Sequence, residues 1–131
     1  MLERLHIETR EEWLSKRSVG IGASESAAIL GLSKWETPIS LWRKKVGGEK
    51  KDLSNNEAVQ RGNRMEPAIR EFFKALHPEY EIEHHPFDIL RQKEMPFLFA
   101  TLDGEMKTHD GKFGVLEIKT AEPRGVEGWK E

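Results

Sequence analysis

The sequence predicts an α+β fold, because one segment has the repeat of a long helix and another has the pattern of two paired strands. From Glu57 to Leu76, apolar or small residues recur at steps of three and four, which places them on one helix face. From Phe97 to Thr120, two apolar runs flank a polar loop that contains glycine, as in a β-hairpin. The length of 131 residues suits one domain.

The composition excludes several classes of protein. The chain has no cysteine, so disulfides, cysteine zinc sites and iron–sulfur clusters are excluded. No segment approaches the roughly 20 apolar residues that span a bilayer, and the N-terminus lacks the apolar core of a signal peptide, so we expect no membrane contact and a cytoplasmic location. The net charge of -2 opposes a general attraction to DNA. Any contact with DNA would therefore have to be local.

The loop of the predicted hairpin sets the register of its strands. His109-Asp110-Gly111 fits a three-residue loop with glycine in the left-handed conformation, so that Thr108 faces Lys112. Counting outward from this pair places Asp103 opposite Glu117 on the same face, with Cβ atoms roughly 5 Å apart. Two carboxylates side by side destabilise a sheet unless a cation lies between them, so we expect a divalent metal bound through oxygen atoms.

The same alternation assigns the other residues of the hairpin. Lys119 lies one pleat further along the acidic face. Leu116 and Ile118 point to the opposite face, which we expect to form the core together with Leu98 and its alternate neighbours. A bulge at Gly104 would shift this register by one residue.

Glu66 is an unusual residue of the predicted long helix. It lies four residues after Gly62 and three before Ile69, at the edge of the apolar stripe, where a charge requires a metal or a basic partner. Pro67 removes the backbone bond to the carbonyl of Asn63 and should kink or restart the helix. The alternative is that Glu66 only caps a helix that begins at Pro67.

Two further helix starts are clear in the N-terminal half. Thr9 and Glu12 have the spacing of a capping box, which predicts a short helix that ends near Ser18. Thr37 and Pro38 are a typical N-cap and first residue of a second helix that runs to a glycine. Strands are expected near residues 80–83 and in the apolar run at 87–90.

A glycine-rich segment between these helices is a candidate anion site. Two glycines lead from Arg17 into a small-residue helix that Gly31 closes, and Ser24 lies at or near its first turn. Free backbone N–H groups and a nearby arginine suit a phosphate. The alternative is an ordinary glycine loop capped by a serine.

The most basic stretch of the chain is either a solvated face or a surface that follows a DNA backbone beside the acidic site. Its residues are Arg43, Lys44, Lys45, Lys50 and Lys51.

The order of these motifs resembles a known group of enzymes. Asp103 followed by Glu117-Ile118-Lys119 on an apolar strand resembles the PD-(D/E)xK nucleases. Together with Arg17-x6-Ser24 and Gly62-x3-Glu66-Pro67, it resembles the YqaJ-type viral recombinase exonucleases, relatives of lambda exonuclease, over nearly the whole chain.

The resemblance implies a restriction-endonuclease-like fold of the α/β three-layer type, with a mixed β-sheet flanked by helices. It implies that Asp103, Glu117 and the backbone carbonyl of Ile118 hold Mg²⁺, for which Mn²⁺ can substitute, and that Glu66 completes the acidic cluster. Lys119 would orient or activate the attacking water for phosphodiester hydrolysis.

The resemblance also implies a substrate and partners. Arg17 and Ser24 match residues that hold the 5′-phosphate of a duplex, so double-stranded DNA ends would be digested 5′ to 3′ in phage-type recombination inside a bacterial host cell. Candidate protein partners are further copies of the chain and a phage single-strand annealing protein.

One departure from the family pattern qualifies these expectations. The family continues past Glu-x-Lys into a helix with a Gln-x3-Tyr-like motif, to which nothing here corresponds. We therefore expect residues 1–131 to be the front portion of one nuclease domain, shortened at its C-terminal end, with weak and non-processive activity. We also expect an exposed strand through which the chain either associates or needs a separate partner to cover it. Two alternatives stay open: an endonuclease of the restriction or repair type, and a catalytically idle fragment that binds DNA ends or a partner.

Overall fold

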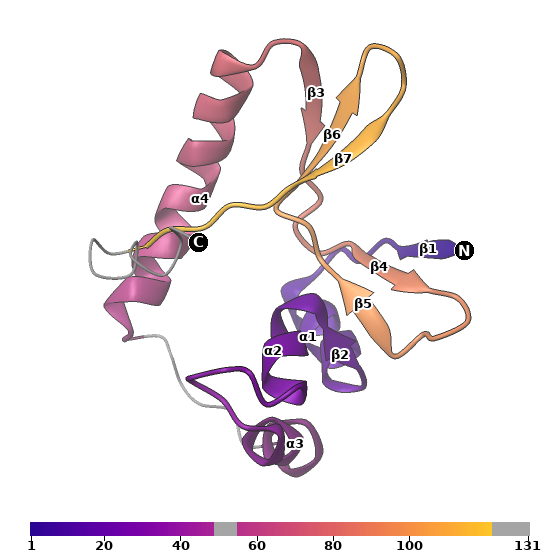
Figure 1. Cartoon of the computed structure of the whole chain (residues 1–131), viewed down its shortest axis with the longest axis vertical. Helices are drawn as coiled ribbons and strands as arrows, with labels where there is room; N and C mark the ends of the chain where they lie inside the picture. Colours follow the sequence, from indigo (N-terminus) through magenta and orange to yellow (C-terminus); the bar gives the residue numbers. More distant parts are fainter. Residues whose placement is uncertain (49–54, 122–131) are drawn as a thin grey trace. The chain divides into compact units, whose positions relative to one another are not determined.

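The computed structural model describes residues 1–48 and 55–121, and their contacts divide the chain into two compact units. The first unit consists of Met1–Lys51 and His85–Leu102, and the second of Asp52–His84 and Asp103–Glu131. Both units contain helices and strands, which confirms the α+β class and is compatible with a restriction-endonuclease-like fold (Figure 1). No helix in the described ranges has the length and apolar content that crossing a membrane requires.

In the described part of the first unit, four strands form a mixed sheet. Their spatial order is β1 (Leu2–Leu5), β4 (Ile89–Gln92), β5 (Leu98–Ala100) and β2 (Ile21–Gly22). The short β2 runs parallel to β5, whereas the other two pairs are antiparallel. The sheet therefore joins the N-terminal segment to a segment that is more than half the chain length away.

The two predicted helix starts of this unit are confirmed. Helix α1 (Arg10–Ser18) begins at Thr9, whose hydroxyl accepts a backbone hydrogen bond at 3.2 Å. Helix α3 (Pro38–Gly47) begins at Thr37 and ends at Gly48, which adopts the left-handed conformation with φ of 68°. Local capping chemistry thus determined both helix starts.

The predicted small-residue helix is broken into two short pieces. A 3₁₀ turn (Ala23–Glu25) is followed by α2 (Ser26–Ile29). Gly31, with φ of 70°, closes the segment as predicted. Because α2 has four residues, it provides no extended helix terminus for an anion.

The core of the first unit lies where β4, β5 and the β1–α1 connection meet. Its buried side chains are Ile7, Ile89 and Phe99, with Leu5, Trp13 and Phe87 packed against them. Gly20 passes so close to this core that a Cβ atom there would lie 2.6 Å from the Phe97 carbonyl oxygen. A side chain at this position would therefore displace β5.

The described residues of the second unit form a three-stranded antiparallel sheet and one long helix (Figure 1). The strands are β3 (Tyr80–Glu83), β6 (Gly104–Thr108) and β7 (Phe113–Leu116), in the order β3–β6–β7. Helix α4 (Glu57–Leu76) precedes β3, and the rings of Phe73 and Tyr80 stack with centroids 6.5 Å apart.

Helix α4 has the predicted bounds but continues through Pro67. Asn56 is its N-cap and accepts the Val59 N–H at 3.1 Å, so the alternative in which Glu66 caps a helix beginning at Pro67 is wrong. The proline removes one hydrogen bond, and the turns on either side keep the helix continuous.

The predicted burial of the α4 apolar stripe is only partly observed. Phe72 and Leu76 are 66% and 59% exposed, whereas Arg70 is buried. The inner face of the helix is centred on Glu66, Arg70 and Phe73, because these residues contact neighbouring groups. Helical periodicity therefore identified the helix, but its inner face is shifted toward Glu66 and Arg70 relative to the predicted stripe.

The predicted hairpin register is confirmed, but the predicted hairpin length is wrong. Gly111 has φ of 80°, Thr108 N donates to Lys112 O at 3.0 Å, and Gly104 pairs with Leu116 without a bulge. Leu98–Ala100 does not continue the hairpin, because it pairs with β4 and β2 in the other sheet, where Phe99 is buried. The hairpin therefore consists of β6 and β7 alone.

Asp88 is a buried carboxylate of the first unit that is held by cations. Arg4 Nη1 donates to its Oδ2 at 3.0 Å, and His6 Nδ1 lies 3.0 Å from the same oxygen. Burial raises the pKa of Asp88, but the Arg4 hydrogen bond and the charges of His6, His85 and Arg4 outweigh it, so the pKa lies below its ordinary value. The resulting stability is present above the pKa of an unfolded aspartate, about 3.9, and is lost as the pH falls through the lower folded value.

We predict that Asp88→Asn lowers the unfolding free energy at about pH 7 by about 1.5–3 kcal/mol, the usual contribution of hydrogen bonds to a charged group. The variant should also lose less stability than the wild type between about pH 7 and about pH 3, which denaturant titrations at both pH values would measure. Glu94→Gln is the control, because Glu94 pairs with the N-terminal amine at an exposed site. Equal acid sensitivity in Asp88→Asn and wild type would contradict the assignment.

Candidate active site

The candidate site of the second unit begins on one face of α4. Gly62, Glu66 and Arg70 are spaced four residues apart and therefore lie above one another. Arg70 is 5% exposed, and its Nη2 donates to Glu66 Oε1 at 2.6 Å. Its Nε donates to the backbone carbonyl of Asp103 at 2.7 Å. One guanidinium thus joins the helix to the residue that precedes β6.

Asp103 in turn holds the segment that follows β7. Its Oδ2 accepts the Ile118 N–H at 2.8 Å. Hydrogen-bonded pairs alternate along an antiparallel ladder, so a continued hairpin would direct this N–H to Leu102. The Asp103 side chain replaces that backbone acceptor. The pairing of β6 with β7 ends at Gly104 and Leu116, so the predicted opposition of Asp103 and Glu117 lies one step beyond the paired residues.

Glu117 and Lys119 lie beyond the strand that was expected to carry them. Strand β7 ends at Leu116, and the Glu117 carboxylate forms an ion pair with the Lys119 ammonium, each side chain being 54% exposed. The segment then runs beside α4 (Figure 1), where a Cβ atom on Gly62 would lie 3.4 Å from the Thr120 hydroxyl oxygen. Glycine therefore permits close contact one turn before Glu66.

The donor groups of this site fit a hard divalent cation in chemical type. Asp103, Glu117 and Glu66 offer carboxylate oxygens and Ile118 offers a carbonyl, which are ligands that Mg²⁺ and Mn²⁺ accept. Asp103 and Glu66 each use one oxygen in the bonds above. Within the described residues, the second oxygen of each accepts no hydrogen bond.

The carboxylates are not gathered into a closed metal centre. In the part of the chain that the structure describes, no three His, Asp or Glu side chains are close enough to hold an ion. Glu66 is paired with Arg70, and Glu117 with Lys119, because each carboxylate is stabilised by its nearest cation. The predicted ligand residues thus lie in one unit, but they do not form a metal-binding cluster in this arrangement.

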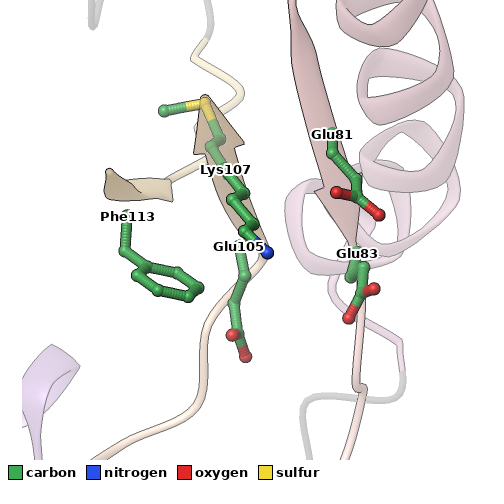
Figure 2. A pocket seen from close by; sticks show the side chains of 6 residues that line it. Glu81, Glu83, Glu105, Lys107 and Phe113 are labelled. Atoms are coloured by element: carbon green, nitrogen blue, oxygen red, sulfur yellow. The ribbon is translucent and has the colours of Figure 1, made fainter. Parts of the chain in front are cut away.

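The sheet of the second unit also carries an acidic hollow of about 170 Å³, lined by none of the candidate site residues. Figure 2 shows Glu81 and Glu83 on β3, across from Glu105 and Lys107 on β6. Side chains alternate along β3, so Glu81 and Glu83 lie on the face opposite Tyr80, whose ring stacks on Phe73 of α4. This hollow was not predicted, although the alternate charges of β3 and β6 were a usable signal for it.

Arg70 is the main site residue that the sequence analysis missed. A basic residue four positions after Glu66 is a common helical pair, so the spacing was a usable signal. Its burial and its bond to Asp103 depend on tertiary structure.

The residues predicted to hold a 5′-phosphate both belong to the first unit. The Arg17 guanidinium lies 4.5 Å from the centre of the Trp13 ring, and a Cβ atom on Gly22 would lie 3.4 Å from its Nη2. Ser24 is exposed in the 3₁₀ turn directly after Gly22. The Arg17 side chain is therefore positioned beside the backbone that leads to Ser24.

Lys45 and Glu25 hold the backbone at Arg17 and Gly22, and this ion pair was not predicted. Lys45 Nζ pairs with Glu25 Oε2 at 2.8 Å and donates to the Arg17 carbonyl at 2.8 Å. Glu25 also accepts the Gly22 N–H at 2.7 Å. Lys44 pairs with Glu36, so much of the basic stretch is engaged within the unit. Lys50 and Lys51 lie outside the described residues.

Comparison with known proteins agrees with the resemblance seen in the motifs. Residues 12–128 match the profile of the YqaJ-like viral recombinase domain. The chain is 32% identical over 123 residues to the uncharacterized protein YqaJ of Bacillus subtilis (strain 168), a match that covers 94% of this chain and 37% of that protein. No solved structure matches the chain. The chain therefore belongs to the YqaJ-like viral recombinase domain family.

Proposed function

We propose that the chain is the catalytic part of a metal-dependent deoxyribonuclease that digests double-stranded DNA from its ends, 5′ to 3′, in phage-type recombination. The observation that supports this most directly is the set of contacts that joins Glu66, Asp103 and the Glu117–Lys119 segment within one unit. The chain spans 37% of the length of the curated relative that it matches, so processivity and assembly belong to the proposal for the whole protein.

Different residues of the chain would bind the metal ion and stabilise charge during phosphodiester hydrolysis. Asp103, Glu117, Glu66 and the Ile118 carbonyl would hold Mg²⁺ or Mn²⁺. The chemistry that this ion supplies when bound is charge stabilisation at the phosphodiester and activation of a water molecule. Lys119 keeps an ammonium beside Glu117, where it donates to the attacking water or to a phosphate oxygen as negative charge develops.

In the first unit, Arg17 and Ser24 would bind the terminal 5′-phosphate. The Arg17 guanidinium is planar and forked, which suits bidentate contact with phosphate oxygens, and the ring of Trp13 holds it from one side. The exposed hydroxyl of Ser24 adds a neutral donor. Recognition of a chain end by the first unit and hydrolysis by the second would make the nuclease dependent on DNA ends.

We predict that Asp103→Ala abolishes Mn²⁺ binding measured by calorimetry, because it removes a ligand and the acceptor of the Ile118 N–H. Asp110→Ala is the matched control, since Asp110 lies in the loop of the same hairpin and pairs with Lys112 at 2.6 Å. Unchanged Mn²⁺ affinity in Asp103→Ala would exclude Asp103 as a ligand.

Lys119→Ala should reduce kcat by about 10²–10³-fold and leave Mn²⁺ affinity nearly unchanged, because the ammonium stabilises charge without coordinating the ion. The assay compares a linear duplex with a closed circle, and the wild type should degrade the linear form alone. Lys112→Ala controls for loss of an exposed lysine. Near wild-type turnover in Lys119→Ala would rule out this role, and cleavage of the circle would indicate an endonuclease.

Arg17→Ala and Ser24→Ala should each reduce the preference for 5′-phosphorylated over 5′-hydroxyl ends, with the larger loss for the charged contact. Digestion rates on matched duplexes would measure this preference. Lys16→Ala is the neighbouring control. An equal loss of rate on both kinds of end would indicate a general defect in place of a lost phosphate contact.

A further inference from the structure

Arg70 is more completely enclosed than any other basic residue for which the structure describes the surroundings. It is 5% exposed, and its Nε and Nη2 atoms bond to acceptors on different elements, the Asp103 carbonyl and Glu66 Oε1. A buried guanidinium that made only one of these bonds would lose much of its compensation for burial. We therefore expect the hydrogen bonds of Arg70 to Asp103 and to Glu66 to form and break as a pair.

These bonds affect the two carboxylates that the proposed function assigns to metal binding. Glu66 is held through one oxygen, so its Oε2 is left without a hydrogen bond among the described residues. Asp103 is held through its backbone carbonyl, while its Oδ2 accepts Ile118 N–H and its Oδ1 is left without one within the same described part. Each carboxylate therefore has one oxygen in a hydrogen bond and one oxygen without a hydrogen bond among the described residues.

We infer that Arg70 is a positioning residue of the metal site, which fixes Glu66 and Asp103 relative to each other without contacting the ion. This inference rests on the proposed function. The guanidinium also places positive charge directly beside the Glu66 carboxylate, which stabilises that carboxylate when no ion is bound. Groups that orient metal ligands in this way typically change metal affinity by about 10–100-fold when they are removed.

The forked shape of arginine is required for this role. Its two nitrogens reach acceptors on a helix and on the chain before β6 at the same time, 2.6 Å and 2.7 Å away. Lysine carries a single ammonium on a flexible four-carbon stem, which would satisfy one acceptor at the expense of the other. Arg70→Lys should therefore retain the positive charge but no longer hold Glu66 and Asp103 relative to each other.

The test measures Mn²⁺ affinity of the whole 131-residue chain by calorimetry for Arg70→Met and Arg70→Lys. Both variants should bind Mn²⁺ about 10–100-fold more weakly than the wild type. Lys74→Ala is the matched control one turn along α4, where Lys74 pairs with the exposed Glu71 at 3.0 Å, and it should bind normally. If Arg70→Met fails to fold, the lysine variant, which retains the buried charge, decides the result.

A second measurement needs no metal and separates this inference from the proposed function. Arg70→Lys should speed hydrogen exchange of the Ile118 amide about 10-fold, because the Asp103 acceptor loses its anchor. Wild-type protection of Ile118 together with wild-type Mn²⁺ affinity in both variants overturns the inference and leaves the proposed function intact. A wild-type chain that binds no Mn²⁺ overturns the metal site, and this inference with it.

Discussion

The site in the second unit depends on the buried guanidinium of Arg70, which connects α4 to the start of the hairpin. Removing one partner of a buried ion pair costs about 3–5 kcal/mol, and the cost here is lower because the Glu66 side chain is 32% exposed. The Asp103 carboxylate accepts the Ile118 N–H and so fixes the segment that follows β7. Gly62 lets this segment approach α4 closely. Three of the four sequence motifs, those of Glu66, Asp103 and Glu117, thus become neighbours within the second unit through a few polar contacts.

The two units carry different kinds of candidate site residue. The first unit supports Arg17 with the ring of Trp13 and with the carbonyl contact of Lys45, which leaves a forked cation beside a glycine-rich turn. The second unit carries Asp103 just before β6 and the Glu117–Lys119 ion pair just after β7. An enzyme that must recognise a DNA end and hydrolyse a nearby bond benefits from separate groups for the two tasks, because binding and chemistry can then be tuned independently.

Local chemistry was predictable from the sequence, whereas the division of strands between sheets was not. The loop around Gly111 fixed the hairpin register, and Thr9 and Thr37 fixed two helix starts, because each depends on a few adjacent residues. The assignment of Leu98–Ala100 to the other sheet depended on distant partners. The role of Arg70 was missed for the same reason, since a charged residue on a helix usually faces solvent.

We propose that Asp103 and Glu66, held by Arg70, contribute to one divalent-metal site. Anomalous diffraction from crystals soaked in Mn²⁺ would test this site directly, because the signal locates the ion and its ligands together. We expect a peak coordinated by Asp103, Glu117 and the Ile118 carbonyl, with Glu66 beside it and Arg70 still bonded to the Asp103 carbonyl. A well-ordered site without a Mn²⁺ peak, or a peak bound only by the glutamates of β3 and β6, would show that these residues do not form the metal site.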